Sequence, residues 1–184
     1  MRKVLVLFIL LILPAAGFSK VEIEGVNFEQ QRKVVDTELQ LTGTALLTWA
    51  VFFDVYVGAF YLPEGQATSR WEEDVPKLLE ISYLRNFKAD DFSSSSDELL
   101  RNNLQPSKYQ ALAERLDRFY QFFRDISPGD RYSLVYHPGI GTELRLNGER
   151  LGSVAGHDFA VAYFGLWIGP SPISESFRDR ILGG

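Results

Sequence analysis

The sequence contains no cysteine, and this absence excludes several kinds of chemistry together. Without thiols the chain forms no disulfide, no cysteine-ligated zinc site and no iron–sulfur cluster, and it has no thiol nucleophile. Histidine is nearly as scarce, with only His137 and His157. Asp158 adjoins His157, but no Gly-x-Ser-x-Gly elbow accompanies them. We therefore expect no catalytic residue, no metal and no cofactor, with His137 in a turn and His157 at a helix start.

An excess of positive charge is also missing. The chain has 19 basic and 24 acidic residues, a formal net charge of −5, which argues against a nucleic-acid partner. Its 184 residues are 46% hydrophobic and 14% aromatic, enough for a large core or an apolar cavity. No linker or internal repeat interrupts residues 20–184, so we predict one domain over this range.

The N-terminal residues have the order of a secretory signal. Arg2 and Lys3 precede an apolar run at residues 4–13, and small residues follow up to Ser19. A membrane-spanning helix needs about 20 apolar residues, more than this run supplies. We predict a signal peptide over residues 1–19, a mature chain from Lys20 without a transmembrane anchor, and a periplasmic location.

Alternating apolar residues predict strands in the first half of the mature chain. Leu39 and Leu41 alternate with polar neighbours, and residues 52–62 form a longer strand on which neither face is polar throughout. Both faces of this strand are therefore expected to be covered for part of its length. Tyr56 shares one face with Asp54 and Phe60, whereas Phe53 and Val55 share the other. A third strand is predicted over residues 77–85.

Helical spacing follows in two segments. A capping box at residues 95–98 predicts that a helix begins at the serine run, and apolar residues spaced on one face predict a second helix within residues 107–126. Strands return at residues 131–137 and in a hairpin at residues 144–154, around the turn Asn147-Gly148.

Two further helices are predicted near the C-terminus. Residues 159–167 are long and apolar enough for a buried helix, and Ser171-Pro172 is expected to start the last one, whose apolar points are Ile173, Phe177 and Ile181. The order of elements predicts an α+β fold with an antiparallel sheet and helices on one face.

Three blocks of the sequence resemble a known family. They are Asp54-Val-Tyr-Val-Gly-Ala-Phe-Tyr-Leu62, the stretch from Gly129-Asp130 through Gly141-Thr142 to Asn147-Gly148, and the segment 159–170 with its ending at Leu182-Gly183. In this order and spacing they resemble the chalcone isomerase-like superfamily, in its exported bacterial branch. The resemblance implies an open-faced β-sandwich, a curved antiparallel sheet covered on one face by helices.

The resemblance implies two functions, and both use an arginine. The plant enzymes close a ring in flavonoid synthesis with an arginine that stabilises the enolate, and non-enzymatic relatives bind fatty acids with that arginine and a tyrosine. A guanidinium in an apolar cleft is a strong anion anchor. In this sequence the arginine position holds Leu47, and the tyrosine matches Tyr56. An ungapped overlay places the plant tyrosine and asparagine at Ala89 and Ser96.

We therefore expect a non-catalytic, exported domain that binds a hydrophobic, lipid-like small molecule, such as a fatty acid, in a cleft between sheet and helices. The expected ligand-binding residues are Tyr56, Leu47, Tyr83 and Arg85. One alternative is an isomerase (intramolecular lyase) of the chalcone isomerase type, acting on a small aromatic or enone. Another is a structural or partner-binding periplasmic module whose cleft is filled by side chains. A cavity beside Tyr56 favours binding over the structural module.

Overall fold

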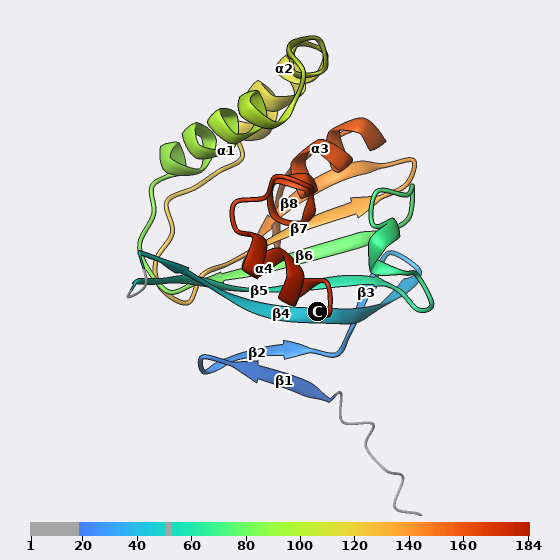
Figure 1. Ribbon diagram of the computed structural model, residues 1–184, viewed down its shortest axis with the longest axis vertical. Helices are drawn as coiled ribbons and strands as arrows, with labels where there is room; N and C mark the ends of the chain where they lie inside the picture. The colour runs from blue at the N-terminus through green and yellow to red at the C-terminus, as the bar shows by residue number, and fades with distance from the viewer. Residues whose placement is uncertain (1–18, 51–52) are drawn as a thin grey trace, which may run out of the picture.

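The computed structural model describes residues 19–50 and 53–184, so most of the predicted signal peptide and the start of the strand predicted at residue 52 lie outside the described residues. A seven-stranded antiparallel sheet forms the centre of the molecule (Figure 1). Its strands lie side by side in chain order: β3 (Gln31–Val34), β4 (Thr37–Trp49), β5 (Phe53–Pro63), β6 (Lys77–Tyr83), β7 (Arg131–His137), β8 (Gly141–Leu146) and β9 (Glu149–Val154).

Local turn chemistry explains the up-and-down order of the later strands. The β8–β9 turn places both Asn147 and Gly148 at positive φ, 52° and 87°, as a two-residue hairpin turn requires. The predicted hairpin at this turn and the predicted strand over residues 131–137 are confirmed.

The helices α1 (Ala89–Asn103), α2 (Pro106–Tyr120), α3 (His157–Ile168) and α4 (Glu175–Ile181) lie on one side of the sheet (Figure 1). A separate hairpin of β1 (Lys20–Ile23) and β2 (Val26–Glu29) lies on the other side. The predicted α+β fold with helices on one face is confirmed. The sequence analysis assigned no element to the hairpin, whose turn holds Glu24 and Gly25 at positive φ.

Two cores explain why both faces of β5 are apolar. On the helix side, Phe60 packs in a large cluster with residues of α2 and α3 such as Phe119 and Phe164. On the hairpin side, Val57 and Tyr61 pack in a second cluster with Phe28. The expectation that both faces of this strand are covered is therefore confirmed, since every residue from Tyr56 to Leu62 is buried.

Glycine allows α4 to lie directly on the sheet. A Cβ atom at Gly43 of β4 would lie 2.3 Å from the carbonyl oxygen of Arg180, and one at Gly58 of β5 would lie 2.6 Å from the Phe177 ring. No side chain fits at these separations, so the two glycines permit a close approach of helix and sheet. The contact holds the C-terminal end of the chain against the strands that carry the candidate site.

Two predicted helix starts are wrong. α1 begins at Ala89, not at the serine run, because Asp91 Oδ2 accepts the Lys88 N–H at 2.8 Å and Asp125 Oδ1 accepts the Ala89 N–H at 3.0 Å. α4 begins after Ser174, whose hydroxyl accepts the Phe177 N–H, so Ile173 lies before the helix.

The second predicted helix also ends earlier than expected. α2 stops at Tyr120, and Ile126 forms a β-bridge with Phe87 instead. Strand β6 ends at Tyr83, so Arg85 lies in the segment that follows it. Within the described residues, no helix is both long and apolar enough to cross a membrane.

Candidate ligand-binding cavity

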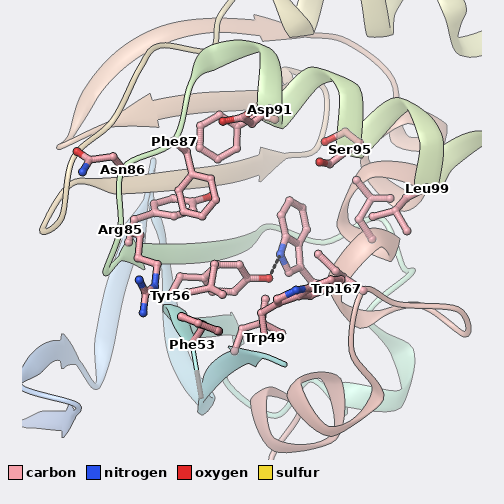
Figure 2. A pocket seen from close by; sticks show the side chains of 17 residues that line it. Trp49, Phe53, Tyr56, Arg85, Asn86, Phe87, Asp91, Ser95, Leu99 and Trp167 are labelled. Carbon is pink, nitrogen blue, oxygen red and sulfur yellow. Dashed lines mark hydrogen bonds between the residues drawn. The ribbon is translucent and has the colours of Figure 1, made fainter. Parts of the chain in front are cut away.

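A cavity of about 630 Å³ lies between the sheet and helices α1 and α3, open to solvent at one side (Figure 2). Its walls come from the ends of β4, β5 and β6, from α1 and α3, and from Ile173 before α4. The lining residues are Leu47, Trp49, Phe53, Val55, Tyr56, Tyr83, Arg85, Asn86, Phe87, Asp91, Phe92, Ser95, Ser96, Leu99, Leu166, Trp167 and Ile173.

The sheet register brings three of the four predicted site residues together. Leu47 on β4 is the cross-strand partner of Tyr56 on β5, and Tyr56 is the partner of Tyr83 on β6. Their side chains form a row on the helix side of the sheet, and each is at most 7% exposed. Arg85 lines the same cavity from beyond the end of β6.

A β-bulge in β5 lies at this wall of the cavity. Leu47 pairs with Tyr56 and Thr48 pairs with Asp54, so Val55 is an extra residue in β5. An extra residue breaks the two-residue alternation and turns the following side chains. The prediction that Phe53 and Val55 lie on the face opposite Tyr56 is therefore wrong, because both line the cavity with it.

Tyr56 is the polar centre of the inner wall. Its hydroxyl oxygen accepts the Trp167 Nε1–H at 3.0 Å (Figure 2), and its ring makes edge contacts with Tyr83 and Phe177. Burial raises the pKa of Tyr56, so the hydroxyl stays protonated at neutral pH. Its proton is available for donation to a ligand acceptor.

Tyr83 offers a second neutral hydroxyl. It is 5% exposed, lies among Phe87, Phe92 and Tyr132, and makes no side-chain hydrogen bond within residues 19–50 and 53–184. Burial raises its pKa well above the usual value. The inner wall therefore presents two uncharged hydroxyls among aromatic and aliphatic carbon atoms.

Charge is confined to the solvent side of the cavity. The charged lining residues are Arg85 and Asp91, and both are exposed. The Arg85 Nε–H donates to the Asp54 carbonyl oxygen at 2.8 Å, and its guanidinium lies 5.2 Å from the centre of the Phe53 ring. Exposed apolar side chains also line this cavity, with Trp49 at 69%, Phe53 at 52% and Ile173 at 39%.

Several lining residues were missed from the sequence. Trp167 lies in the apolar stretch that predicts a buried helix, and nothing in that stretch distinguishes a cavity-facing residue from a core residue. Ser96, an overlay position, lines the cavity, and its hydroxyl lies 3.0 Å from that of Tyr163. Ala89, the other overlay position, is at the start of α1 and is not a lining residue.

Neither histidine reaches the cavity. His137 ends β7, and its Nδ1 lies 2.8 Å from the Pro138 carbonyl oxygen in the turn. His157 begins α3, and its Nε2 lies 2.7 Å from the Glu72 carbonyl oxygen. Both lie where the sequence places them, in a turn and at a helix start. The described part of the chain holds no group of three His, Asp or Glu side chains arranged to bind a metal.

Comparisons with known proteins give a family and a structural neighbour. The family model described as chalcone isomerase-like matches residues 20–183. A crystal structure of a fatty-acid binding protein from Arabidopsis thaliana superposes with a TM-score of 0.71 at 18% sequence identity, covering 90% of this chain and 96% of that one. No curated protein sequence matches. The structural likeness shows a shared fold, and the family match spans nearly the whole described chain, so the protein belongs to the chalcone isomerase-like family.

Proposed function

We propose that this protein is a non-catalytic binding protein for a hydrophobic, lipid-like small molecule held in the cavity beside Tyr56. The observation that carries the proposal is the open space itself. A volume of about 630 Å³ lies within the usual range of ligand sites, roughly 300–1,000 Å³. A structural module with a filled cleft has no need of this space, and the fatty-acid binding neighbour has the same fold.

The lining supports a hydrophobic ligand with few polar atoms. Aromatic and aliphatic side chains form most of the wall, and Tyr56 and Tyr83 are neutral donors within it. A ligand chain gains free energy by leaving water for such a wall, at about 25 cal/mol per Å² of apolar surface buried. A single carbonyl or hydroxyl oxygen on the ligand has Tyr56 as its donor.

The same lining disfavours the isomerase alternative. Enolate chemistry of the chalcone isomerase type needs a cation beside the reacting oxygen, and the side chain opposite Tyr56 is Leu47. Burial keeps Tyr56 and Tyr83 protonated, so neither serves as a base at neutral pH. These features favour binding without turnover.

We also propose that the protein acts after export, in the periplasm. The support is the order of basic, apolar and small residues before Lys20, together with a family match that begins at residue 20. A binding protein in that compartment would carry or store a ligand that is poorly soluble in water.

Two serines of α1 offer a matched test of the cavity. Ser94 and Ser95 are both exposed, but only Ser95 lines the cavity. Ser95→Trp places an indole in the binding space, and Ser94→Trp places the same indole outside it. With a fluorescent fatty-acid analogue as the probe, we expect binding by the wild-type protein and Ser94→Trp and at least about tenfold weaker binding by Ser95→Trp. Equal affinities in all three proteins, or no binding to any of them, would contradict the proposal.

A further inference from the structure

Arg85 is a fixed cation at the solvent side of the cavity. Its Nε–H donates to the Asp54 carbonyl oxygen, and its guanidinium lies over the ring of Phe53, the cross-strand partner of Trp49. One hydrogen bond and one ring contact orient a side chain that would otherwise move freely in solvent. Figure 2 shows Arg85 beside Phe53 and close to Asn86, which also lines the cavity.

The terminal nitrogens of Arg85 are free to bind an anion. Within the described residues neither Nη atom makes a hydrogen bond, and Arg85 has no carboxylate in ion-pair contact. The neighbouring cation, Lys88, is already paired with Asp125 at 2.7 Å. Two parallel N–H groups without partners match the two oxygens of a carboxylate or of a phosphate group.

The inner end of the cavity has the opposite character. Leu47, Tyr56 and Trp167 are uncharged, and the Trp167 Nε1–H is already donated to Tyr56. An anion placed there would lose its hydration without gaining a cation, which is costly. An alkyl chain placed there carries no charge to desolvate and gains free energy by burying its apolar surface.

We propose that the ligand is a single-chain amphiphile with an anionic head group, bound with its head at Arg85 and its tail toward Trp167. This inference rests on the proposed function. It reverses the orientation that an arginine at position 47 would impose, because that arginine would hold the head group beside Tyr56. The shared chemistry is an anion with two accessible oxygens, either a carboxylate or a phosphate monoester.

Asp91 opposes this anion in part. It is the other charged lining residue, and its Oδ2 accepts the Lys88 N–H at the start of α1. That hydrogen bond and the positive end of the helix offset some of its charge. Asp91→Asn should therefore leave anion affinity unchanged or raise it up to about threefold, and a decrease would contradict an anionic head group beside this residue.

Three probes of equal chain length separate head-group charge from tail binding: dodecanoate, dodecyl phosphate and dodecanol. At low salt, Arg85→Gln should lower the affinity for both anions by about three- to tenfold and change the affinity for dodecanol by less than about twofold. High salt should lower the affinity of the wild-type protein for the anions and have little effect on the affinity of Arg85→Gln for them. Lys88→Gln removes a nearby exposed cation that does not line the cavity, and it should leave all three affinities within about twofold.

Comparing the two anions identifies the head group, and the results distinguish a failure of the head-group assignment from a failure of the proposed function. If Arg85→Gln lowers the affinity for one anion more than for the other, the head group belongs to the chemical class of the more strongly affected anion. Tight binding of all three probes with no response to Arg85→Gln would overturn the head-group assignment and leave the proposed function standing. Absence of binding by all three would contradict the proposed function itself.

Quenching of Trp167 tests the orientation directly. Fatty acids carrying a nitroxide near the carboxylate or near the methyl end are compared in a Trp49→Phe background, and the Trp167 signal is taken as the difference from Trp49→Phe/Trp167→Phe. The methyl-end nitroxide should quench Trp167 more strongly than the head-end nitroxide. The reverse order would place the head group inside and overturn the inference.

Discussion

Replacing Leu47 with arginine tests the proposal that the inner wall of the cavity is apolar and carries no anion anchor. Leu47 is 7% exposed and pairs with Tyr56 across β4 and β5, so a guanidinium at this position would lie beside the Tyr56 hydroxyl. The adjoining cavity of about 630 Å³ has room for the longer side chain and for water around it. We expect the variant to fold.

The magnitudes follow from this geometry. Exposing the leucine surface costs about 1.5–3 kcal/mol, and the arginine methylenes recover part of it, leaving a loss of about 1–2 kcal/mol in the free energy of unfolding. For a domain of this size the midpoint temperature should fall by about 2–8 °C. A carboxylate paired with the new guanidinium should gain about 1.5–3 kcal/mol, roughly ten- to a hundredfold in affinity.

The assay is calorimetric titration with dodecanoate beside a thermal melt, and Leu47→Met is the control that keeps the wall apolar. The nitroxide pattern at Trp167 should also reverse in Leu47→Arg, because the head group now has a partner inside. A fall of more than about 15 °C in the midpoint temperature without dodecanoate binding would contradict a cavity beside Leu47 that accepts a guanidinium. That result would mean that Leu47 is packed core, where an unpaired charge costs several kcal/mol.

Three other predictions concern chemistry, processing and packing. The protein should not accelerate chalcone cyclisation above the spontaneous rate in an absorbance assay, and turnover abolished by Tyr56→Phe would contradict this. N-terminal sequencing of the periplasmic protein should begin at Lys20, and an intact Met1 on a membrane-retained product would contradict export. Gly43→Ala should lower the free energy of unfolding by about 2–4 kcal/mol in denaturant melts, because its Cβ would lie 2.3 Å from the Arg180 carbonyl oxygen. Gly165→Ala should not lower the free energy of unfolding, because its Cβ would lie 3.7 Å from the Trp71 ring, an ordinary contact distance.

Patterning along the sequence predicted most of the sheet because its signals are local. Alternation placed Tyr56 on a strand, and an Asn-Gly turn fixed the β8–β9 hairpin. The serine run misplaced the start of α1, because serine caps many helices but here Asp91 and Asp125 bind the first N–H groups. Asp125 is distant in sequence, so its contribution depends on the fold.

The predicted site residues that line the cavity lie on neighbouring strands or, in the case of Arg85, just beyond the end of one. Leu47, Tyr56 and Tyr83 were expected together and lie in one row, whereas Phe53 joined them only through a bulge at Val55. A bulge is set by pairing with another strand, and it leaves no mark on alternation within its own strand. Trp167 was missed for a related reason, since a helix whose sequence is apolar on nearly all sides does not show which side borders a cavity.

Native mass spectrometry of the protein, purified without detergent, shows directly whether the cavity holds a ligand. We expect a population heavier than the polypeptide by the mass of one amphiphile, released on denaturation and absent or strongly reduced in Ser95→Trp but retained in Ser94→Trp. If the wild-type protein shows the polypeptide mass alone and also fails to take up added dodecanoate, dodecyl phosphate or dodecanol, the ligand-binding account is contradicted.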